Sequence, residues 1–170
     1  MKKLLFILKL FFFAFICSAQ EYITVSPDEW SSMTQTSPFD GTIREAFIMG
    51  SCDNLPDPFL IINRTANEPI HVFLTSLQIV HGNATVEMKF DYEIEKYKLV
   101  AIYSNIQNTI APGNGYVIRF DPQTLSIENF IKKLQIGNTL YVRLYNGTFY
   151  VGQIDFSLNG ADEALEILEK

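Results

Sequence analysis

The chain is poor in the side chains from which most catalytic and metal sites are built. Its 170 residues include two cysteines and two histidines, and zinc needs clusters of these residues. Asp53, Asn54 and Asp57 offer oxygen ligands, but they lack the spacing of a calcium loop and are ordinary turn residues. The sequence therefore predicts no metal site and no cofactor.

Motifs for nucleophilic catalysis are also missing. No serine stands in a Gly-X-Ser-X-Gly context. Cys52 would need the fold to bring it to His71 or His81, and it has no flanking motif. A free cysteine usually packs as a small hydrophobe, so we expect Cys52 to be buried. We predict no catalytic residue and a protein that is not an enzyme.

Positive charge is scarce. The chain has 13 Lys and Arg against 19 Asp and Glu, a net charge of −6. Three of the lysines lie within residues 1–19, which hold no acid, so the remainder is more acidic still. Such a chain is a poor candidate for binding nucleic acid or anionic lipid. We therefore expect no nucleic-acid partner.

A long apolar run occurs only at the N-terminus. Two lysines open the chain, residues 4–16 are apolar apart from Lys9, and the small residues of Cys17-Ser18-Ala19 follow. This order predicts a secretory signal peptide, and the run is too short for an ordinary membrane-spanning helix. We expect cleavage between Ala19 and Gln20, a periplasmic or secreted location, and no integral membrane segment in the mature chain.

A lipid anchor on Cys17 is the alternative reading of the same segment. The residue before a lipid-modified cysteine is usually small, and here it is Ile16. We therefore expect a cleaved signal peptide and not a lipoprotein.

Beyond the predicted signal peptide the sequence shows no repeat, low-complexity stretch or linker. Residues 20–41 are rich in Ser, Thr, Pro and Asp, and we expect an irregular lead-in that docks Trp30 and Phe39 onto the domain. Residues 42–170 have the length of a single domain.

Strand patterns dominate this domain. In one of them Val86, Met88 and Phe90 alternate with Glu87, Lys89 and Asp91, which predicts a half-buried strand with a solvated outer face. The predicted strands are residues 42–50, 59–64, 70–75, 77–80, 84–91, 97–103, 116–120, 139–145 and 148–158.

Two helices are expected among these strands. The first begins at Ser126 and ends at Gly137, with a stripe formed by Ile127, Phe130, Ile131 and Leu134. The second follows Asn159-Gly160 and carries an apolar stripe of Ala161, Ala164, Leu165 and Leu168. The fold is therefore predicted to be mainly β: an antiparallel β-sandwich or open barrel with two short helices, the last one C-terminal.

Asn146-Gly147 predicts a tight hairpin between the last two strands. A two-residue turn pairs Leu144 with Phe149, but the same register would turn Ile154, Phe156 and Leu158 away from the core. A one-residue bulge near Gly152 restores the pattern and turns Asp155 outward. We expect that bulge, with Phe149 and Val151 facing inward.

The outer face of this hairpin is the candidate contact surface. Tyr141, Tyr145 and Tyr150 share it, with Arg143 between them. Tyrosine and arginine are enriched where proteins contact other proteins. The alternative is that another element of the fold covers these residues.

Three segments of the C-terminal half carry a family resemblance. They read VEMKFD at 86–91, ENFIKKLQIGNTLYVRL at 128–144 and IDFSLNGADEALEIL at 154–168. Their order resembles the VasI/TagO family of small periplasmic proteins, which are associated with type VI secretion in Gram-negative bacteria. The resemblance implies an exported, non-enzymatic domain, and it carries over no catalytic residue.

The leading hypothesis is an exported, periplasmic, non-catalytic binding or accessory protein that contacts an envelope protein, with secretion-system association implied by the resemblance. One alternative is a small envelope hydrolase or a calcium-dependent sugar-binding domain. Another is an exported inhibitor or immunity protein. A pocket lined by His71, Cys52 or several carboxylates would favour the enzyme, whereas a flat tyrosine-rich sheet face would favour the binding protein.

Overall fold

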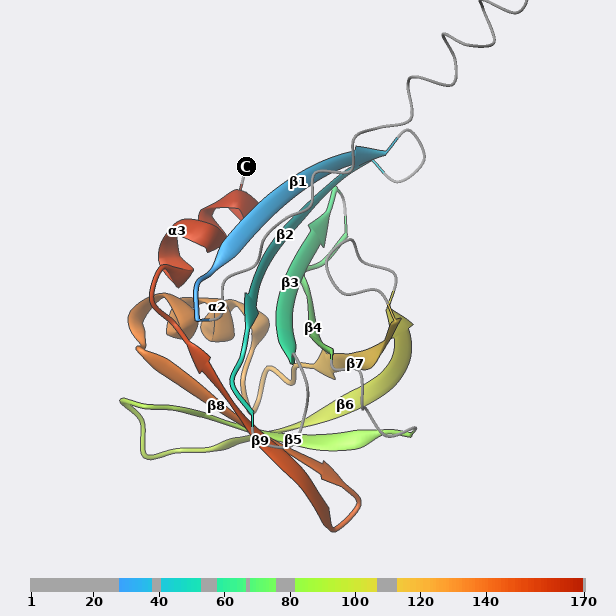
Figure 1. Cartoon of the computed structure of the whole chain (residues 1–170), viewed down its shortest axis with the longest axis vertical. Helices are drawn as coiled ribbons and strands as arrows, with labels where there is room; N and C mark the ends of the chain where they lie inside the picture. Colours follow the sequence, from blue (N-terminus) through green and yellow to red (C-terminus); the bar gives the residue numbers. More distant parts are fainter. Residues whose placement is uncertain are drawn as a thin grey trace, which may run out of the picture.

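The computed structural model describes residues 28–37, 41–52, 58–66, 68–75, 82–106 and 113–169. Within them the fold is mainly antiparallel β, with two short helices of which the last is C-terminal, as Figure 1 shows. This confirms the expected fold class. The predicted signal peptide, its cleavage site, Phe39 and the predicted strand at 77–80 lie outside the described residues.

All the strands of the described part belong to one open sheet. They are β1 (Ser31–Ser37), β2 (Gly41–Met49), β3 (Phe59–Thr65), β4 (His71–Thr75), β5 (Ala84–Phe90), β6 (Tyr97–Ile106), β7 (Gly113–Arg119), β8 (Thr139–Asn146) and β9 (Phe149–Ser157). The spatial order is β1-β2-β3-β4-β7-β6-β5-β8-β9, with antiparallel neighbours throughout. Most neighbouring strands follow one another in the sequence and form hairpins. The β4–β7 and β5–β8 pairs instead join distant parts of the chain.

The sheet curls until its second strand reaches its last. Just after β2, Ser51 forms an antiparallel bridge with Asp155 of β9. The Ser51 N–H donates to the Asp155 carbonyl at 2.9 Å, and the Asp155 N–H donates back at 3.0 Å. This pair of hydrogen bonds ties the segment after β2 to β9, so that the curved sheet surrounds one interior.

The expected irregular lead-in at residues 20–41 is wrong for its second half, where β1 pairs with β2 along its whole length. The serine and threonine content suggested a loop, but a polar edge strand has the same composition because much of it faces water. Trp30 docks as expected: it packs against the core, and its Nε1 donates to the Ser157 carbonyl at 2.8 Å.

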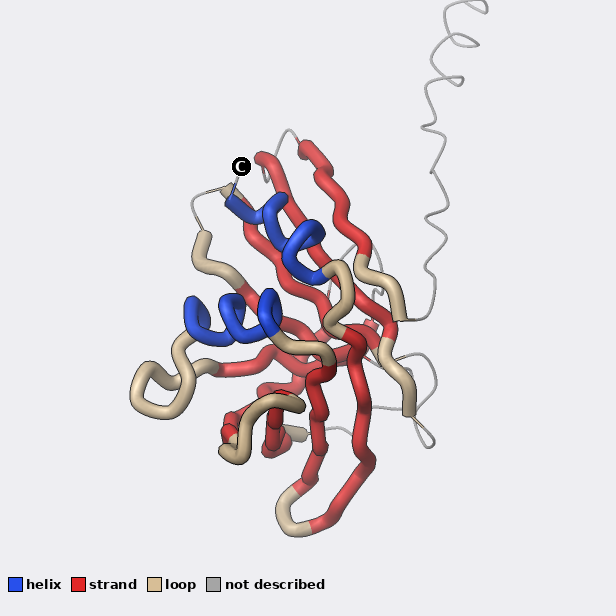
Figure 2. The backbone as a smooth tube through the Cα atoms, turned by 90° about the vertical axis from the view of Figure 1, so that its left-hand side faces the viewer, coloured by secondary structure: helices blue, strands red, loops and turns tan. Residues whose placement is uncertain are grey.

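Both helices face the interior of the curved sheet and lie on the same side of the molecule, as Figure 2 shows. In α2 (Ile127–Ile136) the Ser126 side chain accepts a hydrogen bond from the Asn129 N–H, which confirms the predicted N-cap. Phe130 and Leu134 are fully buried, and Ile127 and Ile131 pack against the same core.

A second anchor of α2 is Lys133. Its ammonium group pairs with Glu93 and lies 5.4 Å from the centroid of the Tyr97 ring and 5.9 Å from that of Phe90. Burial alone would lower the pKa of Lys133, but the hydrogen bonds with Glu93 and Tyr97 outweigh it and raise that pKa. The cation therefore ties α2 to the β5–β6 turn.

The final helix α3 (Ala161–Leu165) continues into the 3₁₀ turn η1 (Glu166–Glu169). Gly160 precedes it with φ of 81°, a conformation that favours glycine. The expected apolar stripe is buried throughout, and Arg64 of β3 donates to the Leu168 carbonyl at 2.8 Å. This segment packs against β1 and β2 and so covers their end of the core.

The β8–β9 hairpin contains the predicted bulge but not the predicted turn register. Tyr145 pairs with Tyr150 and Leu144 with Gly152, so Val151 is the extra residue. The bulge buries Ile154, Phe156 and Leu158, as expected. However, Asn146 pairs with Phe149 and lies in the strand, and Phe149 is 74% exposed at the tip. The inward placement of Phe149 was therefore wrong, and Val151 is half-buried.

Asp91 fastens the end of β5 to the start of β8. Its carboxylate accepts hydrogen bonds from the Asn138 backbone N–H at 3.1 Å and from the Asn138 Nδ2 at 2.9 Å. Partial burial works to raise the pKa of Asp91, but the hydrogen bonds from Asn138 outweigh it and leave that pKa below its ordinary value. The ionised form is therefore the one that the fold stabilises.

Replacing Leu165 by Asp should lower the free energy of unfolding by about 3 kcal/mol or more, because a charge would enter the site of a side chain that is 2% exposed. Thermal or urea unfolding measures the effect. The exposed neighbour provides the control Glu166→Asp, which should melt like the parent. Equal melting of Leu165→Asp and the parent would show that α3 does not cover the core.

Asp91→Ala should cost about 1 kcal/mol of unfolding free energy at neutral pH, the usual value of such hydrogen bonds. Because the folded pKa of Asp91 is lowered, its contribution is present above the ordinary carboxyl pKa and is lost as pH falls through the folded pKa. The difference between parent and variant should therefore shrink below about pH 4. Urea unfolding across pH measures it, with exposed Asp162→Ala as control. A difference that persisted unchanged at low pH would contradict the assignment.

Candidate functional site

The candidate surface is the outer face of β8 and its neighbours. Leu140, Val142 and Leu144 are buried on the inner face, so the residues between them point outward. These are Tyr141, Arg143 and Tyr145. Tyr150 of β9 pairs directly with Tyr145, and their ring centroids are 5.7 Å apart. The fold thus brings together all four residues of the predicted contact surface, which we call the Tyr–Arg face.

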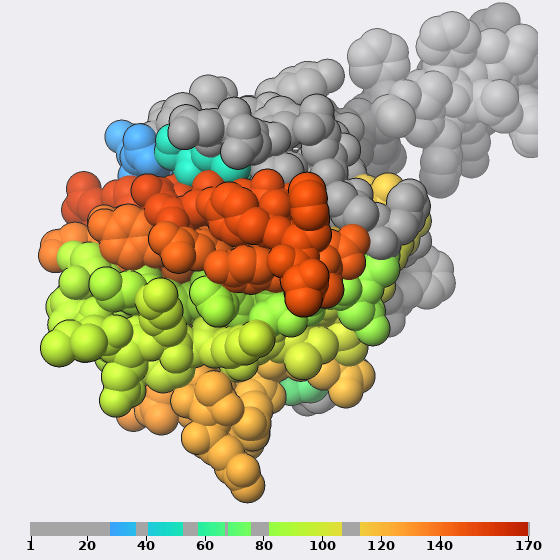
Figure 3. Space-filling model, turned by 90° about the horizontal axis from the view of Figure 1, so that it is seen from below, coloured from blue at the N-terminus to red at the C-terminus, as the bar shows by residue number. Residues whose placement is uncertain are grey.

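Strand pairing arranges this outer surface into rows across four strands. One row is Gln153–Arg143–Glu87–Lys98, from β9 through β8 and β5 to β6. A second is Asp155–Tyr141–Lys89, and a third is Tyr150–Tyr145–Thr85–Val100. Directly opposed residues project to the same face of a sheet. Figure 3 shows β8 and β9 alongside β5 and β6 on this side of the molecule.

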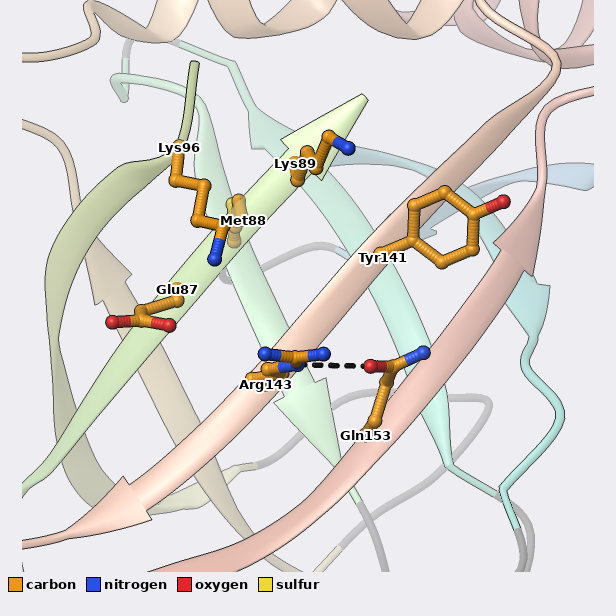
Figure 4. Close-up of a pocket in the computed structure, with 7 residues that line it drawn as sticks. All are labelled: Glu87, Met88, Lys89, Lys96, Tyr141, Arg143 and Gln153. Carbon is orange, nitrogen blue, oxygen red and sulfur yellow. Dashed lines mark hydrogen bonds between the residues drawn. The ribbon is translucent and has the colours of Figure 1, made fainter. Parts of the chain in front are cut away.

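A concavity of about 310 Å³ opens between these rows. The lining residues are Glu87, Met88, Lys89, Lys96, Tyr141, Arg143 and Gln153 (Figure 4). They come from β5, β8, β9 and the turn before β6. Three of the seven side chains are cations and one is an acid, in a chain whose net charge is −6.

Hydrogen bonds between described residues fix part of the lining, and none of them involves Lys89 or Lys96. The Arg143 Nε donates to the Gln153 Oε1 at 2.9 Å, and the Gln153 Nε2 donates to the Asp155 Oδ1 at 2.9 Å. The Glu87 carboxylate accepts from the Tyr145 hydroxyl at 3.3 Å. Within the described residues the only ion pair is Lys133–Glu93, so Lys89 and Lys96 are not ion-paired there.

A second hollow, of about 450 Å³, continues the surface over β6 and β7. Two further cations, Lys98 and Arg119, line it with one acid, Asp121. Val100, which is 53% exposed, lies between the two cations and belongs to both the hollow and the third row. Apolar and cationic side chains therefore alternate over an area wider than the first concavity.

Sequence reasoning found the tyrosines and Arg143 but missed the lysines. The alternation in β5 predicts that Lys89 points outward to solvent, and this is correct. It does not predict that Lys89 lies beside Tyr141 and near Arg143. Nothing local indicates that β5 pairs with β8, which lies about fifty residues further along the chain.

The structure does not bring Cys52 and His71 together. His71 lies in a row with Asn63 and with Glu45, which is in the middle of β2. Cys52 lies beyond the C-terminal end of β2. At the usual rise of a strand this separates them by roughly 20 Å. Cys52 is half-buried against the core, less than the full burial expected, and His81 lies outside the described residues.

Glu45 is a buried carboxylate that no sequence motif singles out. It is 2% exposed, and its Oε1 accepts from the Asn63 Nδ2 at 2.9 Å. His71 shares its row but lies two strands away, a separation of about 10 Å. Asn63 stands between the two in the row.

Another hollow, of about 410 Å³, lies beside the start of α3. Glu29 and Glu163 line it together with Trp30. Two carboxylates at this place disfavour an anion. Asp155 of β9 points outward, as predicted. The segment Asn159-Gly160 therefore serves to turn the chain into its closing helix.

In the described part of the chain, no group of three or more His, Cys, Asp or Glu is arranged to hold a metal ion. The oxygen-rich run at 53–57 lies outside that part. No helix there is long and apolar enough to cross a membrane. Comparison with known proteins gave no matching family model, no matching curated protein and no matching solved structure.

Charge reversal at Arg143 should leave the fold intact. Arg143 is exposed, so Arg143→Glu should change the free energy of unfolding by about 1 kcal/mol or less, including the repulsion from Glu87 directly opposite. Thermal unfolding measures it. The adjacent inward position gives the matched variant Val142→Asp, which should be strongly destabilised. Equal destabilisation of the two variants would show that the Tyr–Arg face is covered in the folded protein.

Proposed function

We propose that this chain is an exported, non-catalytic binding or accessory protein of the bacterial cell envelope. It contacts an envelope protein through the Tyr–Arg face and the concavity beside it. The observation that carries the proposal is the gathering of three cations and Tyr141 around one exposed concavity, without ion pairs to the lysines in the described residues. Export to the periplasm rests on the N-terminal signal pattern of the sequence.

The composition of the surface supports a role in recognition. Tyrosine and arginine are among the residues enriched in protein interfaces, and tyrosine buries a large area at a small cost in side-chain entropy. The Tyr145–Tyr150 pair and the Arg143–Gln153 hydrogen bond hold part of this surface in place before a partner arrives. A surface that is ordered in advance loses less freedom on binding.

Catalysis receives less support from the same structure. The Cys52 and His71 side chains lie on distant parts of the sheet, and the buried Glu45 is separated from His71 by Asn63. The resemblance to the VasI/TagO family adds a secretion-system association to the proposal. That association would make the partner a component of the envelope machinery of a Gram-negative cell.

An affinity capture tests the function. The full chain, purified after export, is immobilised and exposed to an envelope extract of its own source cell. We expect a defined partner to be retained by the parent and lost with Arg143→Glu. The matched control is Lys132→Glu, which makes the same charge change at an exposed position on α2. Capture of nothing, or equal capture by the parent and Arg143→Glu, would overturn the proposal.

A further inference from the structure

The outer surface of the sheet differs in charge from the rest of the molecule. Five cations line its two hollows: Lys89, Lys96, Lys98, Arg119 and Arg143. The chain has only 13 Lys and Arg in total, against 19 acidic residues. A large share of the positive charge of an acidic protein is therefore collected on one side.

The surface holds few acids that could neutralise these cations. Glu87 lies between Arg143 and Lys98 in its row, and it is already hydrogen-bonded to Tyr145. Asp155 is hydrogen-bonded to Gln153 in the neighbouring row, and Asp121 in the second hollow accepts hydrogen bonds from Gln123 and Thr124. No ion pair joins Lys89, Lys96 or Arg119 to any acid of the described residues. Cations that are gathered together repel one another, and a bound anionic group would relieve this repulsion.

We infer that the partner docks through an acidic polypeptide segment, with a carboxylate seated in the concavity between Lys89, Lys96 and Arg143. The inference rests on the proposed function and names the chemistry of its partner. Arginine and lysine bind carboxylates by charge-assisted hydrogen bonds. The Arg143 Nε is held by Gln153, which leaves the terminal guanidinium nitrogens to reach the ligand.

The shape of the surface favours a polypeptide over a single sugar or a free anion. The row Tyr150–Tyr145–Thr85–Val100 runs beside the cationic rows, and Tyr150 and Val100 are 47% and 53% exposed. Four strands at the usual spacing span about 15 Å, which suits several consecutive residues of a chain. A partner with acidic residues next to apolar ones complements both kinds of row.

Titration with short peptides tests this chemistry without knowing the partner. Oligo-glutamate, oligo-glutamine and polygalacturonate are added separately to the full exported chain, and backbone amide shifts are followed by NMR. We expect oligo-glutamate to shift the amides of β5, β8 and β9 and to bind more weakly as salt rises. Oligo-glutamine should cause no such shifts, and polygalacturonate should bind at least about tenfold more weakly, a difference of about 1.4 kcal/mol.

Neutral variants locate the site. Lys89→Gln and Arg143→Gln should each weaken oligo-glutamate binding about twofold to fivefold, the usual worth of one exposed ion pair. Lys132→Gln on α2 should leave it unchanged. Absence of oligo-glutamate binding, shifts located elsewhere, or equal binding of polygalacturonate would each overturn the inference.

Two results separate this inference from the proposed function. If the envelope extract yields an Arg143-dependent partner while oligo-glutamate fails to bind, the function stands and the acidic chemistry is wrong. A second copy of this acidic chain could also occupy the surface. Analytical ultracentrifugation at rising protein concentration tests for this self-association. Self-association that Arg143→Glu abolishes would assign the surface to the homodimer and overturn the proposed acidic partner.

Discussion

The pairing of β5 with β8 is the interaction on which the rest of the structure depends. It joins residues 84–90 to residues 139–146, two segments that share no hairpin. On the inner face it buries Val86, Met88 and Phe90 in the core, where Phe90 packs on Phe130 of α2. On the outer face the same register sets Glu87 opposite Arg143 and Lys89 opposite Tyr141. Core and candidate site are therefore two consequences of one ladder, and a slip of one residue would exchange their faces.

Several contacts stabilise this register from the ends of the strands. Asp91 binds Asn138 just beyond the β5–β8 ladder, and Lys133 of α2 packs over Phe90 while it pairs with Glu93. The bridge between Ser51 and Asp155 then fixes the free side of β9. Because these contacts surround the ladder, the outer rows have a rigid support. Binding surfaces on strands are positioned more accurately than surfaces on free loops.

The parts of this fold that sequence predicts are those set by local periodicity. Alternation identified β5, and the spacing of Phe130 and Leu134 identified the apolar side of α2. The bulge was predictable because Ile154 and Phe156 must be buried on the same face as Leu144. The position of the turn was not predictable, because Asn146-Gly147 and Gly147-Thr148 both suit a tight turn. The choice between them depends on where the core ends. Phe149 projects past that end. The position of the concavity's lysines beside Tyr141 and Arg143 could not be predicted, because it depends on the β5–β8 pairing, which no local pattern encodes.

The gathering of cations on the outer face of an acidic chain bears on how a partner would approach. At physiological salt, charges more than about 8 Å apart are largely screened. The acidic bulk of the chain would therefore repel an acidic partner only weakly once that partner lies over the cationic rows. At longer range and lower salt the net negative charge would dominate and oppose encounter. Attraction confined to the outer face of a chain with a net charge of −6 would favour docking on that face. In the proposed complex, the basic residues of this face would act on specificity more than on raw affinity.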